Sequence, residues 1–356
     1  MRPQPARGFS FRGSSPDAGE RAFAYAKACG IIGKSFVGKR IAGLGKLRSL
    51  SELDRLIFPG VYRDLPDREL LADLERRILQ RTAKHILSII NSYSRPPELL
   101  VRQLRSCEYA DLKACLHNIS SGMKVPPGLI DIGCFRTVRF EAYPDLAAML
   151  NGTEFEFILE KDLKALQSTG YDFAPLDAEL DLRYYTLLVQ SAGRLSAADR
   201  FLIEQILEGE ISLRNCAWAL RLRGYYKKTV NETAQHLIDL KMPGGKTSLA
   251  AEAHISLNFS MDFRSDWKGW RWEKLLNPEK AGESWAVDPR YFQNAASQYL
   301  YRFCLRRFRH IPFSISFVFC YIKLKQFEED LLTSIAEGLG LGMTSDDVFH
   351  LLEAAS

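Results

Sequence analysis

The sequence lacks the long apolar run that a membrane-spanning helix needs. Its longest apolar stretch is confined to residues 311–322, whereas a helix crosses a bilayer with about 20 residues. The segment 1–20 is rich in Arg, Pro, Gly and Ser and has no apolar centre of the kind found in secretory signals. We therefore expect a soluble protein that reaches a membrane only through its partners.

Paired cysteine motifs and catalytic motifs are missing as well. The seven cysteines are an odd number without CxxC spacing, and the six histidines do not cluster with one another or with cysteine. This pattern argues against a disulfide framework and against a zinc site. Neighbouring acids such as Glu328, Glu329 and Asp330 are better explained by ion pairs with Lys323 and Lys325 on one helix than by acid–base catalysis. The sequence thus offers no catalytic residue, no metal site and no cofactor site.

Two segments end like a phosphate-binding loop without completing it. Residues 28–35 end in Gly-Lys-Ser and residues 240–247 in Gly-Lys-Thr, but both lack the first glycine of the motif. A working loop also follows a buried strand, whereas the residues before both segments are helical in pattern. A nucleotide hydrolase that uses Lys34 or Lys246 is therefore a disfavoured hypothesis.

Helical periodicity, by contrast, is strong. Hydrophobic residues make up 46% of the chain and charged residues 26%, the mixture of a globular protein with a buried core. Between residues 66 and 93 the apolar side chains fall on one stripe of a helix. Helix starts of the capping-box type are predicted at Ser51, Ser196 and Thr344, each with an acid three residues later. These signals predict an all-α fold.

Strand patterns are scarce, and a weak internal repeat is present. Residues 138–142 and 155–157 alternate like short strands, but each fits the edge of a helix equally well. Segments 108–116, 210–216 and 328–335 each place an acidic or hydroxyl residue before a leucine at the start of an amphipathic turn. Their separation of about a hundred residues fits one segment per domain.

Positive charge and tryptophan are unevenly distributed. The net charge is +5, and the N-terminal region is rich in cations. These cations are Arg2, Arg7, Arg12, Arg21, Lys27, Lys34, Lys39 and Arg40. We interpret the run as a solvated tail. Residues 260–294 hold Trp267, Trp270, Trp272 and Trp285. This segment is either a surface insertion held by its aromatic side chains or a contact face for a neighbouring protein.

Three passages together resemble a known family. Residues 311–331 contain Ile-Pro-Phe-Ser-Ile followed by an apolar helix with a tyrosine, a lysine and a glutamate. Residues 180–223 contain Leu-Asp-Leu-Arg-Tyr-Tyr, then Glu-Ile-Ser-Leu-Arg-Asn, then Leu-Arg-Leu-Arg. Residues 23–28 read Phe-Ala-Tyr-Ala-Lys-Ala. In order and separation they resemble the central-stalk subunit of V/A-type ATPases, called C in bacteria and archaea and d in eukaryotes. Gln326 and Ser212 depart from the family pattern.

The resemblance implies an architecture. The family consists of three similar helical domains around a pseudo-threefold axis, forming a funnel that holds the rotor shaft on one face and sits on the membrane ring with the other. We accordingly expect a flexible tail over 1–19 and helical domains over 20–122, 123–225 and 226–356. The last domain would include the Trp-rich insertion around 260–294.

The resemblance also implies a function. It predicts a non-catalytic rotor subunit, without cofactors, that couples the shaft to the proteolipid ring and so supports ion transport or ATP synthesis. The expected partners are shaft subunits and the ring, and the expected location is cytoplasmic, peripheral on the inner face of the membrane. The candidate interface residues are Tyr184, Tyr185, Asn215, Arg221, Arg223, Phe313, Tyr321 and Lys325.

Competing interpretations accompany these expectations. Core packing is the alternative for Tyr184 and Phe313, and a local bridge between helices is the alternative for Asn215. For the whole chain, the alternative is a basic helical adaptor that binds nucleic acid through its N-terminal cations. In that hypothesis the tryptophans between Trp267 and Trp285 provide stacking surfaces.

Overall fold

The computed structural model describes residues 17–61, 63–279 and 282–353, and the candidate tail 1–19 lies almost entirely outside them. The α-helices of the first half are α1 (Ala18–Ile32), α2 (Leu50–Ile57), α3 (Asp67–Ile90), α4 (Glu98–Leu104), α5 (Ser106–Ser120), α6 (Leu146–Leu150) and α7 (Leu163–Leu166). Those of the second half are α8 (Ala174–Gly193), α9 (Ala197–Gly224), α10 (Val230–Ala234), α11 (Ala251–Ser256), α12 (Pro289–Phe308), α13 (Ile315–Gly340) and α14 (Ser345–Glu353).

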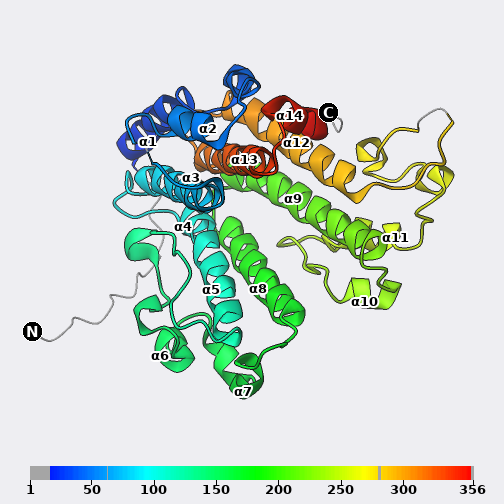
Figure 1. Cartoon of the computed structure of the whole chain (residues 1–356), viewed down its shortest axis with the longest axis horizontal. Coiled ribbons are helices and arrows are strands. Elements are labelled where there is room, and N and C mark those ends of the chain that lie inside the picture. The colour runs from blue at the N-terminus through cyan, green and yellow to red at the C-terminus, as the bar shows by residue number, and fades with distance from the viewer. Residues whose placement is uncertain (1–16, 62, 280–281, 354–356) are drawn as a thin grey trace, which may run out of the picture.

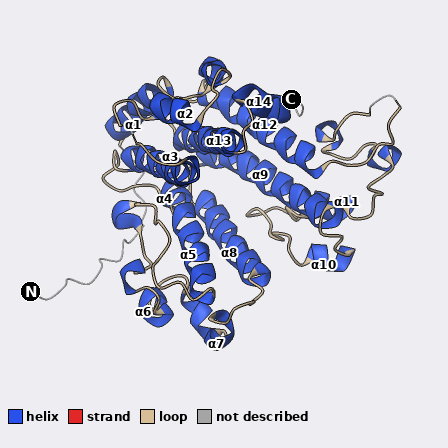
Figure 2. Cartoon of the chain, in the orientation of Figure 1, coloured by secondary structure: helices blue, strands red, loops and turns tan. Residues whose placement is uncertain are grey.

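Short 3₁₀ turns connect them: η1 (Gly38–Leu44), η2 (Gly133–Phe135), η3 (Phe140–Ala142), η4 (Glu156–Glu160), η5 (Arg264–Trp267) and η6 (Glu273–Leu275). Both candidate strands overlap such turns, residues 138–142 with η3 and residues 155–157 with η4. Within the described ranges there is no β-strand, only an isolated bridge between Lys241 and Ser248 (Figure 2). The predicted all-α fold is confirmed.

Side-chain caps explain where several helices begin. Thr344 and Asp347 form the predicted reciprocal pair before α14, with each backbone N–H bonded to the other side chain. The first predicted start was displaced: Ser49 rather than Ser51 caps α2 by accepting the N–H of Glu52 at 3.2 Å. Ser196 caps α9 and its hydroxyl donates to Asp199 Oδ2 at 3.2 Å, while Asp199 Oδ1 accepts the N–H of Ser316 at 3.0 Å. The start of α9 is thereby joined to the start of α13.

The longest apolar run of the sequence begins a buried helix. In α13 every residue from Ile315 to Lys325 is buried, because other helices surround this stretch. Its apolar side chains therefore occupy all sides of the helix, and its two lysines form ion pairs. No helix in the described ranges is long and apolar enough to span a membrane. The neighbours of α13 are α3, which packs along it closely, together with α12, α1, α9, α14, α2 and α4.

Hydrophobic side chains gather in four clusters. The largest joins residues of α1, α3, α4, α8, α9 and α13. Three others lie around it: one on α5 and α8, one on α9, α11 and α12, and one on α2, α3, α13 and α14. In Figure 1 the pair α5 and α8 and the pair α9 and α12 lead away in different directions from the place where α3 and α13 lie.

The Trp-rich segment is pinned by its own aromatic side chains, as the first of the two interpretations predicts. Trp267, Trp270 and Trp272 are buried in the cluster on α9, α11 and α12. Their indole N–H groups donate to Ser260 O at 2.8 Å, Glu252 O at 3.2 Å and Ser212 Oγ at 3.1 Å, respectively. These three buried tryptophans cannot stack with nucleic-acid bases, which removes them from the adaptor hypothesis; Trp285 is partly buried.

Neither near-match to a phosphate-binding loop has the required context. Lys34 follows the end of helix α1, and Lys246 lies in the turn between the bridged residues Lys241 and Ser248. In neither place does a buried strand lead into the loop, so the backbone does not form a phosphate cradle.

Candidate partner-binding site

A large hollow opens between α8, α9 and α12. Its main part has a volume of about 950 Å³. A second part of about 470 Å³, between α12 and α13, shares Gln293 and Ser297 with the first. A smaller cavity joins both, since it shares Leu300 with the first part and Asp330 with the second. Together they form one depression along α12, which we call the central hollow.

Paired charges support one wall of the central hollow. Asp181 of α8 bonds Lys113 Nζ at 2.8 Å and Arg214 Nη2 at 2.9 Å, which links α5, α8 and α9. Deeper in the hollow, Glu210 of α9 forms an ion pair with Lys323 of α13, with a distance of 2.7 Å between the carboxylate oxygen and Nζ. Because each of these charges has an opposite partner, the wall is held rigidly and offers little free charge to a ligand.

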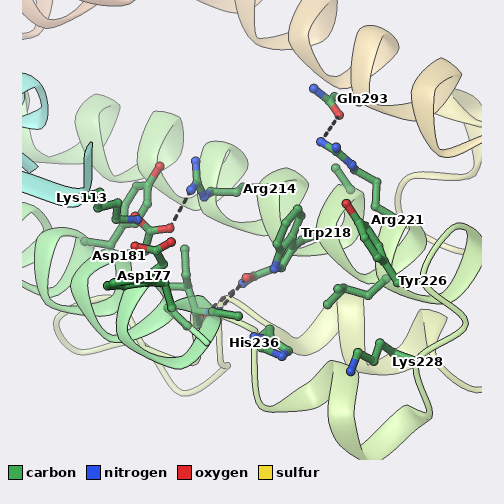
Figure 3. Close-up of a pocket in the computed structure, with 18 of the residues that line it drawn as sticks. Lys113, Asp177, Asp181, Arg214, Trp218, Arg221, Tyr226, Lys228, His236 and Gln293 are labelled. Atoms are coloured by element: carbon green, nitrogen blue, oxygen red, sulfur yellow. Dashed lines mark hydrogen bonds and ion pairs between the residues drawn. The ribbon is translucent and has the colours of Figure 1, made fainter. Parts of the chain in front are cut away.

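A second stretch of wall is aromatic, cationic and open to solvent (Figure 3). Trp218 and Tyr226 are 39% and 59% exposed. The Arg221 guanidinium lies 5.5 Å from the Trp218 ring centre and donates to the Gln293 amide oxygen at 3.2 Å. No carboxylate of the described residues lies within ion-pair distance of Arg221. Trp, Tyr and Arg are the residues that most often dominate the free energy of protein–protein binding.

The opposite end of the central hollow is acidic. Glu329, Asp330 and Glu337 of α13 line the second part. Burial and, to a smaller extent, the neighbouring Asp330 carboxylate raise the pKa of Glu329 to about 8. Enclosure likewise raises the pKa of Asp330 to about 6, opposed by Lys323. A pKa of about 8 leaves Glu329 mostly protonated at neutral pH, so the solvent-exposed Asp330 and Glu337 provide the negative charge for a cationic partner.

Lys325 belongs to a buried network that borders the second part of the hollow, which Glu328 and Phe36 also line. Its Nζ contacts the carboxylate of Glu328 and lies 3.1 Å from Ser35 Oγ. Glu328 Oε1 also accepts the N–H of Phe36 at 2.8 Å and lies 3.6 Å from Arg81. Burial raises the pKa of Glu328, but Lys325 and the hydrogen bonds hold it below its ordinary value. The network ties α13 to α3 and to the segment after α1.

The central hollow brings together three of the eight candidate residues: Tyr185, Asn215 and Arg221. Asn215 is a local bridge, as the alternative interpretation states, because it donates to Ile238 O at 3.0 Å and accepts the N–H of Ile238 at 2.8 Å. Tyr185 is buried beside Glu210. Only Arg221 of these three presents an unpaired charge to the opening.

The other five candidates lie outside the hollow. Tyr321 and Lys325 are buried, and Tyr184 packs edge-on against Tyr109 and Tyr185. Arg223 donates to Ser256 O and Phe259 O, both at 2.9 Å. Phe313 is half exposed, in contrast to its core alternative, with a left-handed φ of 58°. A partner role for these residues stays a prediction.

Sequence reasoning missed Trp218, Tyr226 and the acids of α13 as components of a site. Trp218 lies three residues before Arg221, and that spacing on a helix was a usable signal. The sequence predicts ion pairs of Glu328, Glu329 and Asp330 with Lys323 and Lys325. The structure confirms the pair of Lys325 with Glu328 but directs Lys323 to Glu210, so Glu329 and Asp330 remain on the wall of the hollow.

The described residues contain no group of three His, Cys, Asp or Glu side chains arranged to hold a metal ion. A family model described as "ATP synthase (C/AC39) subunit" matches residues 38–349. The chain belongs to the ATP synthase C/AC39 family. The predicted resemblance to the central-stalk component of V/A-type ATPases is thus confirmed. The chain is also 26% identical over 332 residues to an uncharacterized protein of Treponema pallidum (strain Nichols), covering 90% of this chain and 92% of that protein.

Proposed function

We propose that this C/AC39-family chain is a non-catalytic rotor subunit that seats the central shaft of a V/A-type ATPase on its proteolipid ring. In this role it transmits torque between ATP turnover and ion movement and lies at the cytoplasmic face of the membrane. The observation that carries the proposal is the central hollow, with Trp218, Arg221 and Tyr226 exposed on its wall. We assign the hollow to the end of the shaft.

The size and chemistry of the central hollow support a protein occupant. A volume of about 950 Å³ is at the upper end of small-molecule sites, yet the hollow is open and is bounded by paired charges. It combines an aromatic and cationic wall with an acidic wall on α13, so a helical segment with charges of both signs is its natural complement.

The internal repeat supports three related domains. In α5, Glu108 accepts the N–H of Val138 at 2.7 Å, and in α13, Glu328 accepts the N–H of Phe36 at 2.8 Å. In both helices a buried glutamate therefore accepts a hydrogen bond from a backbone N–H of a non-helical segment. In α9 this role belongs to Asn215, while Glu210 pairs with Lys323. We propose that these helices are the equivalent elements of the funnel's three domains.

The test is affinity purification of the tagged chain from detergent-solubilised membranes of its native host. We expect shaft subunits and the ring proteolipid to be recovered with it. Arg221→Glu should reduce recovery of the shaft subunits at least tenfold, because it reverses the unpaired cation of the hollow. The matched control is Arg68→Glu, an exposed arginine of α3 outside the hollow. Recovery of neither partner by the unmodified chain would refute the rotor role.

A further inference from the structure

The C-terminal half of α12 and the turn η1 carry exposed cations on neighbouring surfaces. Arg302, Arg306 and Arg309 are exposed and follow one face of α12, at spacings of four and three residues. The N–H of Gly38, which begins η1, donates to the hydroxyl of Tyr301 at 2.7 Å. This bond joins η1, in which Lys39 and Arg40 follow Gly38, to the residue of α12 that precedes Arg302.

A further bond extends this surface to the end of α1. The Arg40 guanidinium donates to Gly33 O at 2.9 Å, next to the exposed Lys34. We define the basic face as Lys34, Lys39, Arg40, Arg302, Arg306 and Arg309. Among the described residues, no carboxylate lies within 4.0 Å of any of these six cations. The basic face is therefore a concentration of exposed positive charge without local neutralisation.

Folding stability does not account for this arrangement. Cations in the last turn of a helix interact favourably with its dipole, but that effect is limited to the last turn and does not reach Arg302. Like charges four residues apart on a helix repel one another. The three arginines therefore bring little net stabilisation to α12, and an external anion would relieve their repulsion.

We propose that the basic face binds the anionic headgroups of a phospholipid membrane directly. Guanidinium groups match phosphate oxygens in geometry as well as in charge. The arginines do not line the central hollow, so they form a face that can lie against an extended surface rather than around a peptide. This contact is additional to the proposed seating of the shaft and does not depend on it.

An exposed aromatic residue adjoins the basic face. Three residues after Arg309, the chain reaches the exposed Pro312 and Phe313. Phe313 is 50% exposed although its φ of 58° belongs to the left-handed region, and its ring lies 4.7 Å from that of Tyr25. A strained conformation that presents an aromatic ring to solvent is typical of a contact residue. At a membrane surface the ring would enter the headgroup region beside the cations.

The test is co-sedimentation of the purified full chain with vesicles. One set contains phosphatidylcholine and phosphatidylserine, and the other contains phosphatidylcholine alone. We expect binding only to the anionic vesicles, weakening as salt is raised. Each basic residue near an anionic bilayer strengthens binding about fivefold. The triple variant Arg302→Gln, Arg306→Gln and Arg309→Gln should therefore bind about a hundredfold more weakly.

The matched control also removes three exposed positive charges, at Lys164, Lys246 and Lys268, each replaced by Gln. It should bind like the unmodified chain, and circular dichroism would establish that both variants are folded. Equal losses in both variants would overturn the proposal, since net charge alone would then explain binding. Normal vesicle binding by the arginine variant would also overturn it. If that variant instead failed to recover the ATPase subunits, the basic face would be a protein contact.

A second variant separates a structural role of Phe313 from binding. Phe313→Gly removes the ring and places in the left-handed conformation the residue that adopts it without strain. We expect unchanged or higher thermal stability together with weaker binding to anionic vesicles. Full vesicle binding by this variant would show that the ring takes no part, and the proposal would lose its apolar component.

Discussion

The two neighbouring helices α12 and α13 differ in whether their positively charged side chains are buried and paired or exposed and unpaired. On α13, Lys325 is buried and contacts Glu328, which is itself bonded to Phe36 and lies near Arg81. On α12 and at its C-terminal cap, Arg302, Arg306 and Arg309 are exposed and have no acidic partner in the described ranges. The comparison shows that a cation of the first kind maintains the fold, whereas cations of the second kind are available to a partner.

Replacing Lys325 should have the largest effect. Lys325→Met leaves the buried Glu328 carboxylate without its closest cation, so the free energy of unfolding should fall by about 3–5 kcal/mol. The matched variant Arg306→Met should change it by no more than about 0.5 kcal/mol. Urea unfolding followed by circular dichroism measures both. Equal effects of the two variants would remove the distinction between the helices.

Replacing Glu329 should stabilise the protein in a pH-dependent way. Its pKa is raised from the ordinary 4.5 to about 8, by enclosure and by Asp330, with Thr82, Lys325 and Glu328 also facing it. Glu329 therefore binds its proton more tightly in the folded state than in the unfolded state. As the pH rises from 4.5 to 8, the contribution of Glu329 to the free energy of unfolding falls. Glu329→Gln should add about 2–4 kcal/mol at pH 9.

That gain should vanish below the ordinary carboxyl pKa, where Glu329 is protonated in both states. Urea unfolding at a series of pH values provides the measurement. A gain that is constant across the series would mean that packing, not ionisation, separates the two residues. Because Gln and Glu have nearly the same volume, the substitution changes ionisation without changing packing.

The smallest expected effect is a difference in stability between variants of two arginines of α9, Arg221 and Arg223, which look equivalent in the sequence. Arg223 donates to two backbone carbonyls, so Arg223→Met should lower the free energy of unfolding by about 1–3 kcal/mol. Arg221 donates only to the amide of Gln293, at an exposed position, and Arg221→Met should change stability by less than about 0.5 kcal/mol. Thermal unfolding of both variants checks this, and the reverse order would contradict the assignment of Arg221 to binding.

Much of the fold could be predicted because helical signals are local. The apolar stripe over 66–93 appears as α3, and the apolar run over 311–322 appears as the start of α13. The family resemblance depended on the order of short motifs, and these also lie within single segments. The domain boundaries remain a prediction, while α9 is seen to pack with both α8 and α12.

The site could be predicted only in part, because burial and pairing depend on residues far apart in the sequence. Lys325 and Tyr321 were chosen from a family motif, and nothing local indicates that α3 covers them. Arg221 and Arg223 differ only in that one meets the hollow and the other meets the carbonyls at the end of α11. The basic face was missed because it depends on the bond between Gly38 and Tyr301, which are 263 residues apart.

The bond between Asp199 and Ser316 has a mechanical consequence. It joins the first turns of α9 and α13, the 28-residue and 26-residue helices, at one point. At about 1.5 Å per residue, each helix is roughly 40 Å long. The ion pair of Glu210 with Lys323 links the same two helices a second time, further along α9. Two links at different positions resist rotation of α9 against α13, so a load on Trp218 or Arg221 would be transmitted along α9 to α13.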